Sequence, residues 1–308
     1  MIVAKSGSLS ALHATAFFAA TAIAISTLAG CSAGTDAGPS TGDAEVLPFE
    51  GLDFPSNVDV DSAGNVFLTD WGNDRVLRLD QETNDQAEIP FQGLDSAEGV
   101  AVGSDGTVYV SEGKGIEDNV GGRILEMPTD GTPQKILTSG KDPRSLAVDE
   151  SGVVYFFEVG EQVILKRTPG VKNSEIAVAL SQTNFPDLDG YFNDVAIGSD
   201  GELVAITGLP NPRIFDVTSA HTLKERAVLK GQDRFPIALD INKAGDMVIL
   251  DSKGGKARIL MLSSGATEPI ELSFGELNKP SDVAIDDSGN VYVADRNNHR
   301  VLKLQANV

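Results

Sequence analysis

Short apolar runs follow one another from residue 45 to residue 304, and Gly, Asp, Asn or Pro bounds each run. The clearest example lies near the C-terminus. There, residues 283–285 and 291–293 flank a polar turn that contains Gly289, and a third run follows at residues 300–304. Apolar runs of this length between turn residues are typical of β-strands. The pattern therefore predicts an all-β chain made of short strands.

The same pattern occurs at both ends of this region, because residues 55–79 match residues 280–304 in the order of their apolar, turn and acidic positions. Six such units can be aligned on one turn glycine each: Gly64, Gly106, Gly152, Gly201, Gly245 and Gly289, which are 42, 46, 49, 44 and 44 residues apart. Self-similarity at a nearly fixed period is the signature of a repeat architecture. We therefore expect six copies of one structural unit.

Each unit has room for four strands, which in the first unit are predicted at residues 57–61, 65–70, 75–80 and 86–91. The second strand is apolar at successive positions, as in Val66, Phe67 and Leu68. A sheet with one face in water would alternate instead, so both faces must be covered. Sheets that stack radially around an axis meet this condition. The sequence thus predicts a six-bladed β-propeller with four-stranded antiparallel blades.

The two ends of the repeat region complement each other. The sixth unit ends after its third strand at Leu304, whereas an additional apolar segment, residues 45–49, precedes the first unit. This segment is similar in character to the fourth strand of the first unit, residues 88–91. We expect it to pair in the last blade and close the ring, because closure protects strand edges that would otherwise promote aggregation.

The first 44 residues have a different composition. Lys5 precedes an apolar run that ends in Leu28-Ala29-Gly30-Cys31, and residues 32–44 are rich in Ser, Gly, Thr, Ala and Asp. A basic start followed by an apolar middle and small residues is typical of a secretory signal. Because Cys31 is the only cysteine of the chain, no disulfide within the chain is possible. The alternative is a plain signal peptide or a transmembrane anchor.

The motif at Cys31 resembles a bacterial lipoprotein lipobox, in which the cysteine is lipidated and becomes the mature N-terminus. The resemblance implies a lipoprotein signal peptide at residues 1–30, a flexible tether at 31–44 after lipidated Cys31, and the propeller at 45–308. It also implies an exported protein that is held by acyl chains such as palmitate on the outer side of the cytoplasmic membrane.

The formal net charge of -21 limits the class of partner. Such a surface repels nucleic acid and anionic lipid headgroups, so we expect no nucleic-acid binding. A large net charge also keeps a protein soluble, and we expect a monomer.

The repeat motif resembles the NHL repeat. It is carried by Pro-x-x-Val-x-Val-Asp-x-x-Gly-Asn-Val, an aromatic residue and a later Asp, followed by an Asn-containing loop and Arg-Val-Leu. The motif is clear at residues 55–79 and 280–304 and weaker in the four middle units. Residues 45–55, together with the first repeat unit, are similar to the extracellular sensor domain of the mycobacterial serine/threonine receptor kinase of type D. The resemblance implies binding or sensing at the cell surface and implies no chemistry.

Second strands often end in an acid, and third strands often begin with Arg. The pairs are Asp70 with Arg75, Glu112 with Arg123, Asp251 with Arg258, and Asp295 with Arg300. Because the pair recurs in several units, we expect an ion pair that clamps the intervening loop as part of the scaffold.

Two inner-strand carboxylates are candidate metal ligands. Five positions before the turn glycine, four units carry Ala, whereas two carry Asp59 and Asp240. Hard cations such as calcium prefer carboxylate oxygens, so these residues could hold a divalent cation in the central channel. Two separated Asp are few ligands, however, and the alternative is a pair of solvated or paired carboxylates. We expect the protein to need no cofactor.

An enzymatic function is the alternative to binding. Six-bladed lyases with related repeats rely on histidines, and this chain has only His221 and His299 after the signal segment. Lactonase-like propellers use Glu, Asn and Asp around one ion, whereas Glu98, at the rim, is the only inner-strand Glu found here. A metal-dependent lactonase or lyase that acts in the central channel is therefore the second hypothesis, and a structural scaffold for other envelope proteins is the third.

Binding is the first hypothesis, because the connections between blades and between second and third strands should emerge on one face. Aromatic and charged residues in these connections are candidate anchors for an envelope protein, peptide or glycan. The candidates are Asp53, Trp71, Asn73, Phe185, Tyr191, Phe235, Arg296 and His299. The neighbouring Phe54 also lies on this face, where it could instead fill a gap between blades.

Overall fold

The computed structural model describes residues 44–113, 121–140, 142–159, 161–185, 192–198, 201–208, 212–219, 222–226 and 234–306. Contacts divide the chain into a unit Met1–Gly38 and a unit Pro39–Val308. The predicted signal peptide, Cys31 and the tether up to residue 43 lie outside the described residues, as does Tyr191. Within the described residues no helix is long and apolar enough to cross a membrane.

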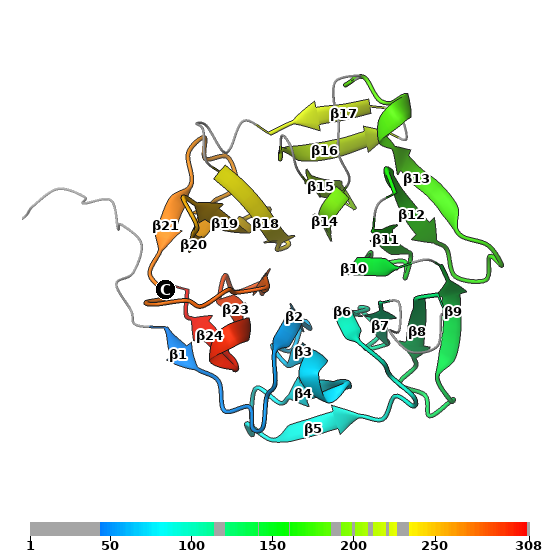
Figure 1. Cartoon of the computed structure of the whole chain (residues 1–308), viewed down its shortest axis with the longest axis vertical. Coiled ribbons are helices and arrows are strands. Elements are labelled where there is room, and N and C mark those ends of the chain that lie inside the picture. Colours follow the sequence, from blue (N-terminus) through cyan, green and yellow to red (C-terminus); the bar gives the residue numbers. More distant parts are fainter. Residues whose placement is uncertain are drawn as a thin grey trace, which may run out of the picture. The chain divides into compact units, whose positions relative to one another are not determined.

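The second unit consists of six four-stranded antiparallel sheets, here called blades 1 to 6, arranged in a ring (Figure 1). Blade 1 contains β2 (Pro55–Val60), β3 (Val66–Asp70), β4 (Arg75–Leu79) and β5 (Gln86–Ile89). Blade 2 contains β6 (Ala97–Val102), β7 (Val108–Glu112), β8 (Arg123–Met127) and β9 (Lys135–Ser139). Blade 3 contains β10 (Pro143–Val148), β11 (Val154–Glu158), β12 (Val163–Arg167) and β13 (Glu175–Ala179).

Blade 4 contains β14 (Phe192–Ile197), β15 (Leu203–Thr207), β16 (Ile214–Ser219) and β17 (Thr222–Glu225). Blade 5 contains β18 (Arg234–Ile241), β19 (Met247–Lys253), β20 (Lys256–Leu262) and β21 (Ile270–Leu272). Blade 6 contains β22 (Asp282–Ile285), β23 (Val291–Asp295), β24 (Arg300–Leu304) and β1 (Glu45–Val46). Among the described residues, three short 3₁₀ helices follow β3, β13 and β23: η1 (Trp71–Asn73), η2 (Leu180–Gln182) and η3 (Arg296–Asn298). The predicted six-bladed all-β propeller is confirmed.

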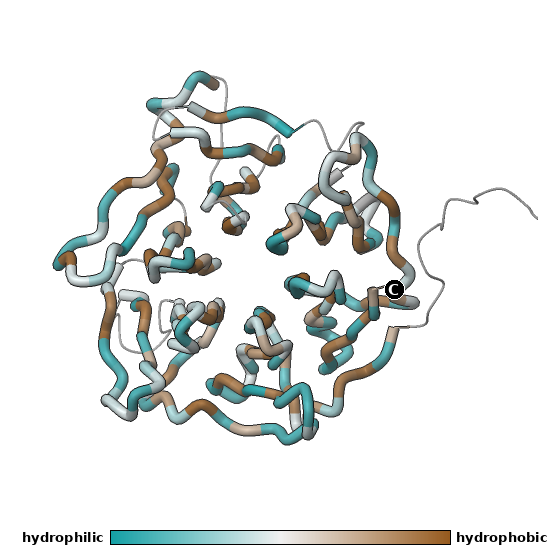
Figure 2. The backbone as a smooth tube through the Cα atoms, turned by 180° about the vertical axis from the view of Figure 1, so that it is seen from behind, coloured by the Kyte–Doolittle hydropathy of each residue, from teal (hydrophilic) through white to brown (hydrophobic). Residues whose placement is uncertain are grey.

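The hydrophobic core lies between the blades. Every residue of β3, β7, β15 and β23 is buried, as their successive apolar positions predict. The buried residues form six clusters, and each cluster joins side chains from two neighbouring blades. Figure 2 shows apolar segments alternating with polar turns along the chain. Neighbouring blades therefore supply each other's apolar contacts.

The turn between the first and second strands fixes the register of each blade. Gly64 and Gly289 both have φ of 84°, a left-handed conformation that is costly for other residues. Before each glycine, a carboxylate caps the turn: Asp61 Oδ1 accepts the N–H of Asn65 at 2.9 Å, and Asp286 Oδ1 accepts that of Asn290 at 2.9 Å. The repeated Asp-x-x-Gly-Asn sequence thus encodes one turn geometry.

The predicted clamps between second-strand acids and third-strand arginines are also present. Arg75 Nε lies 2.8 Å from Asp70 Oδ2, and Arg300 Nε lies 2.8 Å from Asp295 Oδ2. Equivalent pairs join Arg258 to Asp251 and Arg123 to Glu112. In Asp70, Glu112 and Asp295 the second oxygen accepts a backbone N–H from the loop that enters the blade, as Asp70 Oδ1 does from Asp53 at 2.6 Å. The clamp therefore holds that loop as well as the arginine.

The ring closes as predicted, because β1 pairs antiparallel with β24 through Glu45 with Lys303 and Val46 with Leu302. The N–H of Leu47 continues the pairing by donating to the carbonyl oxygen of Val301 at 2.9 Å. The side chain of Leu47 is buried in the cluster that joins blades 6 and 1. The N-terminal segment thus supplies both main-chain and side-chain contacts to the last blade.

We predict that Leu47→Ala lowers the free energy of unfolding by about 2–3 kcal/mol, because it removes apolar contacts from the closing cluster and leaves a cavity. Val46→Ala, one residue away and 57% exposed, should cost less than about 0.5 kcal/mol. Urea denaturation of both variants measures the difference. Equal losses would mean that β1 contributes through strand pairing alone.

Candidate functional site

Two regions bring candidate site residues together. The first is the central channel, which is lined by the innermost strands β2, β6, β10, β14, β18 and β22 and encloses about 560 Å³. The second lies on the face that carries η1 and η3, here called the loop face. The opposite face, which carries the Asp-x-x-Gly turns, is called the turn face.

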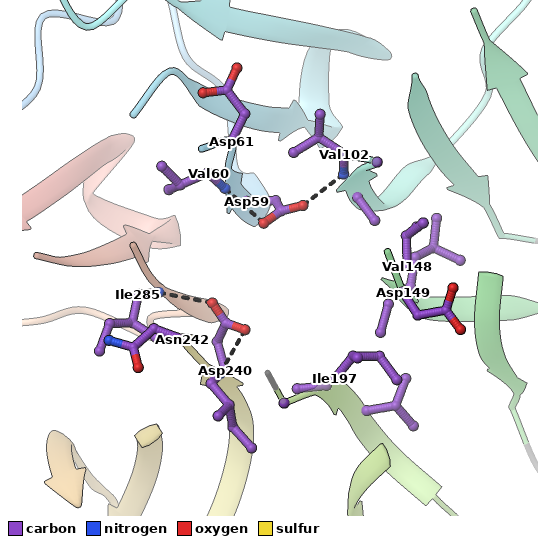
Figure 3. A pocket seen from close by; sticks show the side chains of 18 of the residues that line it. Asp59, Val60, Asp61, Val102, Val148, Asp149, Ile197, Asp240, Asn242 and Ile285 are labelled. Atoms are coloured by element: carbon purple, nitrogen blue, oxygen red, sulfur yellow. Dashed lines mark hydrogen bonds between the residues drawn. The ribbon is translucent and has the colours of Figure 1, made fainter. Parts of the chain in front are cut away.

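Asp59 of blade 1 and Asp240 of blade 5, which are separated by blade 6, both point toward the channel (Figure 3). Asp59 Oδ2 accepts the N–H of Val102 in blade 2 at 2.7 Å, and its Oδ1 accepts the N–H of Val60 at 2.7 Å. Asp240 repeats this arrangement, with Ile285 of blade 6 at 2.9 Å and Ile241 at 2.8 Å. Each carboxylate therefore joins its own innermost strand to that of the next blade.

Other inner-strand side chains make the same kind of bond further along the channel. Asp194 accepts the N–H of Leu239 at 2.7 Å, and Asp282 accepts that of Val58 at 2.9 Å. Asn57 Oδ1 accepts the N–H of Val100 at 2.8 Å. In each case the side-chain acceptor lies in one blade and the backbone N–H donor lies in the next. This repetition indicates a scaffold role for the channel carboxylates.

The channel carboxylates are buried, and burial disfavours their charged forms. Burial raises the pKa of Asp59 to about 7 and that of Asp240 to about 6, and the Asp240 charge adds to the shift at Asp59. The pKa of Asp194 is raised to about 7 by burial. That of Asp282 is raised well above its usual value by burial and by the Asp194 charge.

The proposed metal ligands do not fit a dedicated cation site. A calcium ion takes six to eight oxygen ligands. Both oxygens of Asp59 and of Asp240 are already engaged by backbone N–H groups. Within the described residues, no group of three or more His, Cys, Asp or Glu side chains is placed to hold a metal ion. The hypothesis of a metal-dependent lactonase or lyase thus stays a prediction, and the described residues include no group of side chains that could bind its metal ion.

The raised pKa values predict how stability depends on pH. These carboxyls bind protons more tightly in the folded chain than in the unfolded chain, where Asp titrates near its ordinary pKa of about 4. Between about pH 4 and about pH 7 the folded state therefore holds more protons, and the free energy of unfolding falls as the pH rises. Urea midpoints measured across this window should decrease accordingly.

Asp240→Asn isolates one contribution, because it removes a titrating group and leaves an amide in the same place. The slope of unfolding free energy against pH should become shallower, because the amide does not titrate. The matched control is Glu82→Gln on an exposed turn, which should leave the slope unchanged. An unaltered slope in Asp240→Asn would contradict the assignment.

On the loop face, four predicted residues gather around Phe54. The Phe54 ring lies 4.8 Å from that of His299 and 6.4 Å, edge-on, from that of Trp71. The Arg296 guanidinium lies over both the Trp71 ring, at 5.0 Å, and the Phe54 ring, at 5.9 Å. Asp53 Oδ1 lies 3.3 Å from His299 Nδ1. We call Asp53, Phe54, Trp71, Arg296 and His299 the aromatic cluster.

An unusual backbone conformation positions Phe54 and His299 at the centre of this cluster. Phe54 and His299 both have φ of 51°, a left-handed conformation that is unfavourable for residues other than glycine. The N–H of Phe54 donates to His299 Nδ1 at 3.2 Å, which ties blade 1 to blade 6. Non-glycine residues in this conformation persist only where their surroundings hold them, and they are frequent at binding sites.

A polar arc extends the cluster toward blades 2 and 3. Glu98 lies 3.4 Å from Arg144, which also contacts Asp142 at 3.2 Å. Burial raises the pKa of Glu98, although Arg144 and Arg296 partly offset this effect. The indole N–H of Trp71 lies close enough to Glu98 to lower that pKa, yet Nε1 is buried without a hydrogen-bond partner at bonding distance. Side chains from blades 6, 1, 2 and 3 thus follow one another across the loop face.

The remaining candidates lie elsewhere. Asn73 donates to the Gly51 carbonyl at 2.9 Å and to Asp70 at 2.8 Å, so its amide supports the clamp of blade 1. The Phe185 ring packs against Phe215 at 5.0 Å, beside the core between blades 3 and 4. Phe235 is 42% exposed on β18. Tyr191 lies outside the described residues.

Sequence reasoning misses the roles of Phe54, Glu98 and Arg144. It places Phe54 on the correct face but favours a residue that fills a gap between blades. The one feature of the sequence that could have indicated the place of Phe54 is its position directly before Pro55, which begins β2. For Glu98 and Arg144, no spacing in the sequence indicates that they meet, because they belong to different blades.

The comparisons with known proteins agree with this architecture. Residues 277–304 match the family model of the NHL repeat. No curated relative matches the sequence. The chain is therefore a six-bladed β-propeller that contains an NHL repeat.

Three similar solved structures are enzymes. A streptogramin B lyase has a TM-score of 0.61 at 15% identity, covering 86% of this chain and 97% of the lyase. A gluconolactonase from Xanthomonas campestris has a TM-score of 0.63 at 13% identity, covering 86% and 90%. A PQQ-bound aldose sugar dehydrogenase from Streptomyces coelicolor has a TM-score of 0.61 at 15% identity, covering 88% and 100%. At such identities the likeness shows the fold alone, because one fold supports many functions.

Proposed function

We propose that this protein is a cell-envelope lipoprotein whose propeller binds a ligand on the loop face without catalysing a reaction. The observation that carries this proposal is the aromatic cluster, in which Trp71, Phe54 and His299 gather around Arg296. Aromatic and arginine side chains are the residue types that most often dominate binding interfaces. The cluster is assembled from the first and last blades, so it exists only in the closed ring.

The difference between this cluster and the rest of the scaffold supports the proposal. The inner-strand carboxylates and the acid–arginine clamps recur around the ring with equivalent partners in several blades. Trp71 and Arg296 occupy positions that Gly113, Val159, Gly208 and Ser252 occupy in the other four blades. Within the described residues the cluster is confined to blades 1 and 6, and a ligand explains such a feature better than a need of the fold does.

The cellular setting of this proposal rests on the N-terminal sequence. The Leu-Ala-Gly-Cys motif would direct lipidation of Cys31 and retention on the outer side of the cytoplasmic membrane, with residues 31–44 as a tether. The partner would be an envelope protein, peptide or glycan, recognised by a monomer that needs no cofactor. This setting agrees with the resemblance to extracellular sensor domains.

Trp71→Ala tests the proposal. The variant should reduce the amount of envelope material retained by the immobilised full chain by at least about fivefold, because it removes the central ring of the cluster. Its melting temperature should stay within about 2 °C of the wild type, since Trp71 is half-exposed on a surface helix.

The control is Ile136→Ala on β9, an exposed apolar residue on the outer edge of blade 2. It should leave retention and melting temperature unchanged. A large loss of stability in Trp71→Ala would instead mark the indole as part of the core. Unchanged retention would remove the cluster from the binding surface.

A further inference from the structure

One hydrogen bond between neighbouring blades recurs on the loop face with two different acceptors. The 3₁₀ helices η1 and η3 are each followed by a left-handed residue, which is Asp74 after η1 and His299 after η3. Asp74 Oδ1 accepts the N–H of Ser96 at 2.7 Å, and His299 Nδ1 accepts that of Phe54 at 3.2 Å. Ser96 and Phe54 are both left-handed, and each directly precedes the innermost strand of the next blade. The same bond therefore joins blade 1 to blade 2 through a carboxylate and blade 6 to blade 1 through an imidazole.

The two acceptors differ in how they respond to pH. Histidine ordinarily changes its charge between pH 5 and 8, whereas an ordinary aspartate titrates near pH 4. A neutral imidazole accepts through one nitrogen and donates through the other, but an imidazolium only donates. Because Nδ1 of His299 accepts from Phe54, the proton of the neutral ring is on Nε2, and a second proton would go to Nδ1. Protonation of His299 therefore removes the acceptor of the Phe54 N–H.

Asp53 is positioned to receive this second proton in a hydrogen bond. Its Oδ1 lies 3.3 Å from the same Nδ1. While the imidazole is neutral both atoms are acceptors, so no hydrogen bond joins them. The backbone of Asp53 is fixed in blade 1, because its N–H donates to Asp70 Oδ1 at 2.6 Å and its carbonyl accepts the N–H of Gly72 at 2.7 Å. An imidazolium would thus find this carboxylate already in place.

The charges near His299 act in both directions. The carboxylate of Asp53 favours the imidazolium, whereas the guanidinium of Arg296 on the same 3₁₀ helix disfavours it. Glu98 interacts with Arg296, and the charge of Arg300 is balanced in its clamp. The side chains of His299 and Asp53 are 42% and 46% exposed. The imidazole can therefore exchange protons with water without any opening of the fold.

We infer that His299 is a pH-sensitive switch of the loop face: its protonation exchanges the bond that Nδ1 accepts from Phe54 for a bond that Nδ1 donates to Asp53, and this exchange loosens the aromatic cluster. The inference rests on the proposed binding function and adds its regulation. The ligand should bind at neutral pH and be released as the pH falls toward 5.

The loosening follows from the position of Phe54 in the cluster. The ring of Phe54 lies 4.8 Å from that of His299 and 6.4 Å from that of Trp71, and the guanidinium of Arg296 lies over it at 5.9 Å. A left-handed phenylalanine persists only where its surroundings hold it, and protonation removes the acceptor of its N–H. The imidazolium also adds a second positive charge beside Arg296. Binding then has to restore an order that the neutral form already possesses, which lowers the affinity.

Tryptophan emission tests the switch without any ligand, because Trp71 is the only tryptophan and lies beside Phe54. The emission of the full chain should change between pH 8 and pH 5 in one transition that spans about two pH units, as the uptake of a single proton requires. Asp53→Asn should move this transition to lower pH by at least about half a unit, because the imidazolium loses its carboxylate partner.

His299→Asn assigns the transition to one residue. Asparagine tolerates the left-handed conformation, and its amide oxygen accepts a hydrogen bond at every pH in this range. The variant should abolish the emission change. The channel carboxylates Asp59, Asp194 and Asp240 titrate in the same window and are unchanged in this variant. The matched control is His221→Gln, which removes a histidine elsewhere in the chain and should leave the transition as it is.

The regulatory consequence is measured with the immobilised full chain. The amount of retained envelope material should fall at least about threefold from pH 7.5 to pH 5.5 in the wild type and should be equal at both values in His299→Asn. Equal retention by the wild type at both pH values would show that the switch does not regulate binding.

Two results of the emission experiment would overturn the switch itself: no transition in the wild type, or a transition that persists unchanged in His299→Asn. The proposed function fails separately. If Trp71→Ala retains as much envelope material as the wild type at pH 7.5, the loop face is not the binding surface, whereas an emission change that depends on His299 would still establish the exchange of hydrogen bonds.

Discussion

No blade of this propeller can bury its central strands alone, because a single sheet has two faces and residues such as Leu68 and Val293 are fully covered. The cover comes from the blades on either side, and each of the six apolar clusters is shared by two neighbours. The stability of the propeller therefore depends on the interfaces between neighbouring blades more than on any single blade. The pair made by blades 6 and 1 depends on the N-terminal segment, which completes blade 6 and adds Leu47 to the shared cluster.

On the channel side, polar contacts also join neighbouring blades. Carboxylates such as Asp59 and Asp240 accept a backbone N–H from the next blade, so that this buried donor is not left without a partner. Burial of these charges is unfavourable, as the raised pKa values show, and the hydrogen bonds offset part of that cost. Carboxylates in a channel are thus explained by the ring itself, whereas the aromatic cluster is not repeated in the part of the chain that the structure describes and has no such explanation.

Much of the fold could be predicted from the sequence, because its signals are local and repeated. The consecutive apolar residues of β3 and β23, the turn glycines and the acid–arginine pairs each recur at fixed positions. The ring closure could be predicted because Leu304 ends a unit one strand early and residues 45–49 supply the missing strand.

The site was harder to predict, because its contacts join residues of different blades. Spacing along the chain cannot show that Arg296 lies over the Trp71 ring, or that Asp59 accepts a backbone N–H from the next blade. Phe185 is a candidate anchor by sequence because it is aromatic and in a loop, but its ring packs beside the core. Which side of an aromatic residue is covered depends on packing that a single sequence does not reveal.

The pairing of Glu45 with Lys303 also brings the two ends of the propeller together on adjacent strands. A peptide linker of a few residues could join them as a hairpin, and new ends could then be opened in a loop between any two other blades. The order of the blades around the axis would be unchanged, and every apolar cluster would keep both of its contributors. The point at which the propeller begins is thus one of several cyclic permutations that the same circular arrangement could accept.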